Sequence, residues 1–266
     1  MAALAGLRKG GRAGVRLLQF APVYLFLYAP ILVLIVFAFN DSRYTVSWKG
    51  FTWQWFARLF ENRQLVDAAL NSMKVAVLSA SLSTALGVLA AVSLYRYRFR
   101  LRTVLSTSLY VVMISPDIVM GVSLLILFIG LGLTPGFVPL LMAHVTFCLP
   151  FVAVTVHSRL RGLDSHLIEA AQDLGASEFE AFRHVILPLA WPAVLGGWLL
   201  AFTLSLDDVV ISFFVTGQDF EILPLRIYSM VRMGVKPDVN ALSAVIIAVT
   251  VVCVFTAQIL LRRRKQ

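Results

Sequence analysis

Three acidic side chains lie within long stretches that carry no other charge. Asp117 is alone in the longest of these stretches, and Asp207 and Asp208 are adjacent in another. A carboxylate in a low-dielectric segment usually faces a transport path, pairs with a cation or caps a helix. Carboxylates along a path would favour cations and repel anions, and the nearby hydroxyl of Ser212 could add a further ligand. The chemistry that these residues predict is therefore cation binding.

Local geometry leaves alternatives for each acid. Successive helical residues point about 100° apart, so one of Asp207 and Asp208 is expected to face the path while the other caps a helix or forms a pair. Asp117 follows Pro116, and the alternative there is a broken-helix junction in which the carboxylate accepts freed amides. If both helices rise from the cytoplasm, the three acids reach a similar depth, about 21–25 Å at 1.5 Å per residue.

Other chemistry finds no support in the sequence. The four histidines do not form a metal-binding pattern with Cys, Asp or Glu: His144, His157, His166 and His184. No G-x-x-x-x-G-K-[ST] phosphate loop occurs, so the chain is not expected to bind ATP itself. No nucleophile–base or paired-carboxylate arrangement indicates catalysis. We expect a conduit rather than an enzyme, with no cofactor or metal in this chain.

The composition indicates an integral membrane protein. Of 266 residues, 59% are apolar and 14% charged, with a mean hydropathy of +0.85, whereas a soluble domain carries roughly 25% charged residues. A bilayer core needs about 20 apolar helical residues per span. Six such spans are predicted: Leu17–Asn40, Val75–Tyr95, two within Thr103–Ser158 hinged at Gly130–Gly136, Leu189–Thr216 and Val239–Leu261.

The distribution of Lys and Arg predicts the orientation. One face collects 15 of them and the opposite face seven, which places both termini in the cytoplasm. The expected organisation is a cytoplasmic segment 1–16, a membrane domain 17–261 and a basic tail 262–266. The net charge of +9 is then explained by topology and anionic lipid headgroups rather than by nucleic acid. The outer segment 41–67, rich in tryptophan, is expected to lie at the membrane interface or to contribute to binding.

One cytoplasmic loop, about residues 158–190, differs in composition from its surroundings. It predicts a helix that ends at Gly175 in a left-handed cap and a second helix that starts with a capping box of Ser177 and Glu180 and ends near Pro188. Phe179 and Phe182 should share one face of that second helix. Spacing alone leaves open whether this face fills a partner's groove or packs on the chain's own bundle.

The same loop carries a motif that resembles the motif of a known family. Its residues match E-A-A-x3-G-x9-I-x-L-P, the EAA motif of ABC importer permeases, with Val185 in place of the isoleucine. The resemblance implies an all-α membrane protein, a six-transmembrane-helix type I ABC importer permease whose cytoplasmic coupling helix docks on an ATPase. It assigns ATPase coupling to Glu169, Ala170, Ala171, Gly175, Phe179, Phe182, Leu187 and Pro188.

Further segments are similar to a narrower family. Residues 143–148, 205–212 and 231–240 look like the second permease subunit of spermidine/putrescine importers, with the putrescine type the closer. This resemblance implies a bacterial inner-membrane location, a homologous permease partner, two cytoplasmic ATPase subunits that use ATP and Mg²⁺, and a periplasmic polyamine-binding protein. The alternatives are a permease of the same architecture for another solute, such as iron, and a secondary transporter that works without ATP.

Overall fold

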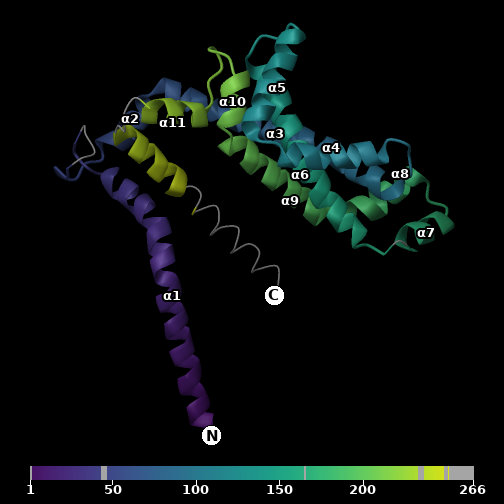
Figure 1. Cartoon of the computed structure of the whole chain (residues 1–266), viewed down its shortest axis with the longest axis horizontal. Coiled ribbons are helices and arrows are strands. Elements are labelled where there is room, and N and C mark those ends of the chain that lie inside the picture. Colours follow the sequence, from purple (N-terminus) through teal and green to yellow (C-terminus); the bar gives the residue numbers. More distant parts are fainter. Residues whose placement is uncertain (1, 43–46, 165, 233–236, 249–250, 252–266) are drawn as a thin grey trace. The chain divides into compact units, whose positions relative to one another are not determined.

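The computed structural model describes residues 2–42, 47–164, 166–232, 237–248 and 251 (Figure 1). Regular structure in these residues is helical, apart from one isolated antiparallel bridge between Asn40 and Phe51. The chain divides into two compact units, one of residues 1–63 and 229–266 and one of residues 64–228. Each unit is described separately.

The second unit holds most of the membrane helices. Its elements in chain order are α3 (Arg63–Arg96), α4 (Arg102–Ile114), α5 (Asp117–Gly130), α6 (Phe137–Arg161), α7 (His166–Asp173), α8 (Glu178–Ala181), the π-helical turn η1 (Phe182–Ile186), α9 (Leu187–Asp207), α10 (Val210–Val215) and the start of α11 (Leu223–Arg232).

The core of this unit is built around α6. Val152 and Cys148 of α6 are fully buried in a cluster with Ala201 of α9 and Ala91 of α3. Small residues on α3 permit a close approach, because a Cβ atom added to Gly87 would lie only 2.9 Å from the Cβ of Val152. Association of helices in a membrane depends on such packing, since lipid provides no hydrophobic drive between apolar surfaces.

Two of the predicted spans are broken helices. α4 and α5 meet at an angle of 115° because Ser115, directly before Pro116, adopts an extended conformation (φ −62°, ψ 135°) that a helix cannot continue. The break in the helix that this alternative predicted is therefore present. α9 ends at Asp207, and the extended residue Asp208 (φ −68°, ψ 124°) separates it from α10.

The other predicted spans agree with the structure where it describes them. α3 and α6 cover the second and fourth, and the hinge at residues 130–136 is the turn between α5 and α6. Within the described residues, four helices are long and apolar enough to cross a membrane, or five if the bent pair is one span. The sixth span begins as the apolar helix Pro237–Ala248, and most of its remaining residues lie outside the described part of the chain.

The first unit contains α1 (Ala2–Phe37), α2 (Gln54–Glu61) and the helix 237–248. After α1 the chain turns at Asn40, which is 1% exposed and whose carbonyl oxygen accepts a hydrogen bond from the indole of Trp55 at 2.8 Å. Four rings form a cluster beside this turn, with centroids 4.8–5.7 Å apart: Phe39, Phe51, Trp53 and Phe56. Of the outer tryptophans, Trp48 and Trp53 are exposed, as residues at an interface would be, while Trp55 is buried.

Candidate functional site: the broken spans and the cytoplasmic loop

The second halves of the two broken spans, α5 and α10, lie side by side (Figure 1). The Cα of Gly121 faces α10 so closely that a Cβ there would lie 2.6 Å from the ring of Phe214. Beyond the far end of α5, the amide of Gly136 donates to the carbonyl of Val215, the last residue of α10, at 3.2 Å. The two half-helices therefore run in the same direction, and each begins next to a break that carries an acid.

The two neighbouring acids at the second break have different environments. Asp208 has a side chain that is 6% exposed and accepts hydrogen bonds from the amides of Ile211 at 3.2 Å and Ser212 at 2.8 Å, so it caps α10. Asp207 is exposed, and the described residues give its carboxylate no hydrogen-bond partner. The expected cap is therefore Asp208, and the path-facing role of Asp207 stays a prediction.

Asp117 resembles Asp207 in its surroundings. It is the first residue of α5, it is exposed, and no described amide donates to its carboxylate. The break at Pro116 therefore exists without the capping role that the local alternative gave to Asp117. Ser212, predicted as a path residue, is instead fully buried and donates its hydroxyl proton to Asp208 at 2.7 Å.

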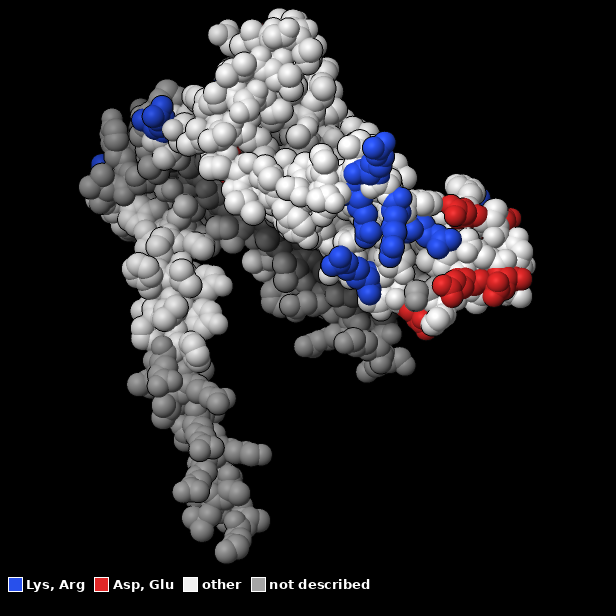
Figure 2. All heavy atoms as spheres, turned by 45° about the vertical axis from the view of Figure 1, so that its right-hand side comes forward, with Lys and Arg blue, Asp and Glu red and all other residues white. Residues whose placement is uncertain are grey.

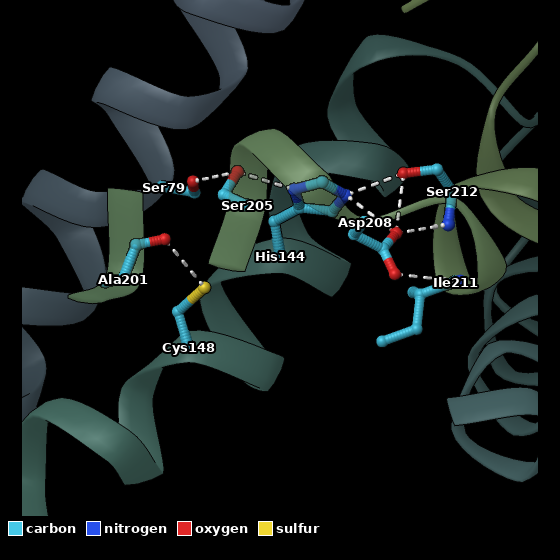
Figure 3. Close-up of polar contacts among 8 residues, drawn as sticks. All are labelled: Ser79, His144, Cys148, Ala201, Ser205, Asp208, Ile211 and Ser212. Carbon is cyan, nitrogen blue, oxygen red and sulfur yellow. Dashed lines mark hydrogen bonds and ion pairs between the residues drawn. The ribbon is translucent and has the colours of Figure 1, made fainter. Parts of the chain in front are cut away.

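A chain of buried polar side chains extends from Asp208 across the unit (Figure 3). His144 of α6 lies with Nε2 2.9 Å from the Ser212 hydroxyl and 3.5 Å from the Asp208 carboxylate. Its Nδ1 lies 2.7 Å from the hydroxyl of Ser205 on α9, which accepts a hydrogen bond from Ser79 of α3 at 2.9 Å. We call these five side chains the His144 network.

The direction of the hydrogen bonds in the His144 network is self-consistent. Ser212 gives its only hydroxyl proton to Asp208, so it accepts from Nε2–H of His144. A neutral imidazole then accepts at Nδ1 from Ser205, and Ser205 accepts from Ser79. Each donor has an acceptor, and the buried negative charge of Asp208 is stabilised by several donors at one end.

This network is not predicted by the sequence, where His144 is weighed only as a metal ligand. Among the described residues no group of three or more His, Cys, Asp or Glu could hold a metal ion. A signal was present, because an ionisable residue within an apolar span is itself a functional indicator. Its serine partners lie on other helices, so only the fold could reveal them.

The cytoplasmic loop forms as predicted up to its second helix. Gly175, with φ +90°, takes the left-handed position after α7; its amide donates to Gln172 at 2.9 Å, and that of Ala176 donates to Ala171 at 3.0 Å. The capping box is present, since Ser177 and Glu180 bond each other reciprocally. These bonds from Ser177 lower the pKa of the Glu180 carboxyl.

The second helix of the loop does not end near Pro188, contrary to the prediction. α8 passes through η1, where the amide of Leu187 donates to Phe182, five residues back, and the chain continues directly into α9. Pro188 is tolerated because it lies at the start of α9, where its missing amide would have little use. α8 is thus joined to a membrane helix without an intervening loop.

The two phenylalanines of the loop are not equivalent. Phe182 packs on the core of its own unit together with Ala171 and Leu187, whereas Phe179 is 68% exposed. An open hollow of about 380 Å³ lies between α7, α8 and η1, and Leu174, 90% exposed, stands on its rim. Phe182 therefore packs on the chain's own bundle, whereas Phe179 remains on the surface of the chain, and its docking in a partner's groove stays a prediction. Of the remaining motif residues, Glu169 is exposed and lies 3.2 Å from His166, and Ala170 and Pro188 are exposed.

A side-chain clasp ties the loop to the end of α3. Arg96 donates to Gln172 of α7 at 3.1 Å and lies 3.6 Å from Glu178 of α8, whose carboxylate also accepts from the Tyr97 hydroxyl. That hydrogen bond raises the pKa of Tyr97. Figure 2 shows the wider pattern, in which acidic side chains occupy the tip of this end of the unit and basic side chains gather beside them.

The arrangement of broken spans and an inserted cytoplasmic helix is that of type I ABC importer permeases. The structure superposes with a TM-score of 0.75 on a subunit of a bacterial alginate ABC transporter in complex with its pentasaccharide-bound periplasmic protein, at 17% identity over 97% of this chain and 96% of that one. A methionine ABC transporter in an inward-facing conformation gives a TM-score of 0.64 at 20% identity over 76% of this chain and 96% of that one. The chain belongs to the family of binding-protein-dependent transport system inner membrane components, which it matches over residues 83–264. It is therefore a multi-pass membrane subunit of a transport system and not an enzyme.

Relatives of higher identity define a narrower group. The chain is 55% identical to the spermidine/putrescine transport system permease protein PotC of Haemophilus influenzae, over 91% of this chain and 94% of that protein. It is 40% identical to the putrescine transport system permease protein PotI of Escherichia coli K12, over 91% and 89%. The resemblance to polyamine permeases is confirmed, and the expectation that the putrescine type is the closer of the two is corrected by these identities.

Proposed function

We propose that this chain is the membrane-spanning subunit of an ATP-driven importer for polyamines, with spermidine and putrescine as substrates. The observation that carries the proposal is the 55% identity over 91% of the chain with a spermidine/putrescine permease. A partner permease, two cytoplasmic ATPases and a periplasmic polyamine-binding protein complete the transporter. Both termini lie in the cytoplasm, in accord with the Lys and Arg distribution.

The exposed acids suit a polycationic substrate. Asp117 and Asp207 begin and end helices at the two breaks, and neither is neutralised by a described partner. A flexible cation that leaves water needs such carboxylates to offset the loss of hydration. Asp208 and Ser212 do not offer free ligands to the substrate, because their polar atoms are already bonded to each other and to α10.

The cytoplasmic loop provides the coupling. Leu174 and Phe179 expose apolar surface beside the hollow, and burying each in a groove on an ATPase would contribute about 1.5–3 kcal/mol. Because α8 continues through η1 into α9, closure of the ATPases would move the helix that ends at Asp207. Through this link, ATP binding would change the side of the membrane from which a substrate reaches Asp117 and Asp207.

The test is uptake of radiolabelled spermidine, putrescine, sulfate and ferric iron by cells that express this chain with its operon neighbours. Saturable, ATP-dependent polyamine uptake is expected, with large losses in Asp117→Asn and Asp207→Asn. Glu169→Lys and Gly175→Asp should abolish uptake while the protein remains in the membrane. Uptake of iron alone would replace the substrate assignment, and normal uptake by both loop variants with intact ATPase association would overturn the coupling assignment.

A further inference from the structure

The His144 network has no direct role in the proposed transport path, because all its side chains are buried. Ser79, His144 and Ser212 are 0% exposed, Ser205 is 3% exposed, and the side chain of Asp208 is 6% exposed. None of these side chains has a buried polar atom without a partner. A fully satisfied polar network in an apolar bundle specifies one arrangement of its helices, since any other arrangement leaves buried groups unpaired.

His144 lies beside the break between α9 and α10 and bonds to both sides of it. One ring nitrogen bonds Ser205, near the end of α9, and the other bonds Ser212, within α10, at 2.7 and 2.9 Å. The imidazole thus bridges the two sides of the break and closes a loop of chain that contains Asp207 (Figure 3). Ser79 extends the bridge to α3, so the break is fixed to two further membrane helices.

We propose that His144 is a positioning residue that sets the geometry of the break between α9 and α10 and thereby the direction of the Asp207 carboxylate toward a polyamine substrate. The inference rests on the proposed function for the role of Asp207. It adds a residue on α6 that touches no substrate and acts through Ser205, Ser212 and Asp208. Without the imidazole, the hydrogen bonds that hold the two helix ends at the break would be reduced to those of the Asp208 cap on α10.

Packing alone does not account for a histidine at this position. Its neighbours one helical turn away on α6, Leu140 and Cys148, are both 0% exposed and apolar in character. A leucine would fill this interior without two nitrogens to satisfy. An apolar side chain cannot form the hydrogen bonds to both sides of the break. A glutamine can form them in part, because its amide has an acceptor oxygen and a donor nitrogen.

The experiment compares His144→Leu with His144→Gln in the complete transporter. Two readouts are measured: spermidine uptake, and the rate at which a cationic methanethiosulfonate reagent modifies Asp207→Cys. The second readout uses a Cys253→Ala background, because the chain has two native cysteines, Cys148 and Cys253. Cys148 is 0% exposed and should not react. His144→Leu is expected to lower the maximal uptake rate about ten-fold and to leave the half-saturating concentration of loaded binding protein unchanged. The same variant is expected to change the rate of cysteine modification about five-fold. His144→Gln should stay within about two-fold of the parent in both readouts.

The outcomes separate the two proposals. If the parent transporter takes up no polyamine, the proposed function fails, and the modification rates still test the positioning of the break. If His144→Leu leaves uptake and modification unchanged, the positioning role is overturned. Equal losses in the Leu and Gln variants, with lowered melting temperatures in both, would show a merely structural role and also overturn it. If His144→Leu does not assemble, Ser205→Ala removes one bridging bond at little cost in volume and is expected to shift the modification rate in the same direction.

Discussion

At the scale of single residues, the adjacent acids Asp207 and Asp208 show how one peptide step changes the physical role of a carboxylate. Asp208 is the first residue of the break, so its side chain can turn back to the amides of α10. Asp207 is the last residue of α9 and points elsewhere, exposed. The sequence predicted one cap because helical neighbours diverge by about 100°, whereas in the structure the two acids differ because α9 ends at Asp207 and Asp208 is extended. The sequence marks His144 as an ionisable residue within an apolar span, but it could not predict the network, because the partner serines lie on other helices.

The two acids should differ sharply in their effect on stability. Asp208→Ala removes a helix cap and leaves buried amides and the Ser212 hydroxyl without their acceptor, at a cost of about 1–3 kcal/mol. Asp207→Ala, at the exposed neighbouring position, is the matched control and should change stability by less than about 0.5 kcal/mol. Thermal unfolding of the purified transporter in detergent measures both. A larger loss in Asp207→Ala than in Asp208→Ala would contradict the assigned cap.

At the scale of helices, the spans were predictable from apolar length, and their breaks only in part. Pro116 marked one break because a residue before proline avoids the helical conformation. Pro188 lies in an equally clear sequence signal, yet the chain continues through η1 into α9. The difference arises because the widened turn places Pro188 at the start of a helix, where it is tolerated. Proline alone does not tell whether a helix stops or begins.

The contact of α5 with α10 gives a prediction for the paired half-helices. Gly121→Leu would force α5 away from α10, because even a Cβ would lie 2.6 Å from the Phe214 ring and 3.3 Å from the Cα of Ile211. Overpacking of this kind costs about 1–3 kcal/mol, and we expect a lower melting temperature and reduced uptake. Gly130→Leu is the control on the same helix, since no atom lies within 4 Å of its Cβ position. Equal effects of the two substitutions would argue against close packing of α5 and α10.

The clasp between α3 and the cytoplasmic loop gives a second prediction at this scale. Glu178→Ala removes the acceptor of both Arg96 and Tyr97, and an exposed pair of this kind contributes about 0.2–1 kcal/mol. Amide hydrogen exchange in α8 of the membrane-embedded transporter should become up to about five-fold faster. Glu178→Gln retains an acceptor for Tyr97 and should lie between Ala and the parent. Unchanged exchange in Glu178→Ala would show that the clasp does not hold α8.

At the scale of the whole chain, the membrane spans are only partly buried, because lipid rather than water surrounds them. The apolar segments of α3, α6 and α9 are only 50%, 44% and 28% buried within the structure. In water such exposure would be prohibitive, whereas lipid tails accept the same apolar surface without cost. Composition therefore predicted the membrane class correctly. Burial patterns, which identify cores in soluble proteins, could not separate lipid-facing from partner-facing sides.

The length of α9 and the charge distribution together predict the orientation of the chain. α9 has 21 residues, which at 1.5 Å per residue gives about 31 Å, close to the thickness of a bilayer core. The loop that contains Asp173 and the turn that contains Gln218 lie beyond its opposite ends, and both residues are exposed. The excess of Lys and Arg predicts that Asp173 lies on the cytoplasmic side and that Gln218 lies on the outer side.

Single cysteines test this orientation in the Cys253→Ala background, where Cys148 is buried and inert. In intact spheroplasts a membrane-impermeant maleimide should label Gln218→Cys and leave Asp173→Cys unlabelled. After permeabilisation both should react, which controls for the intrinsic reactivity of each thiol. Labelling of Asp173→Cys before permeabilisation, with Gln218→Cys protected, would show the reverse topology. The EAA loop would then lie on the outer side of the membrane, where there is no ATP, and the coupling role of α8 would be overturned.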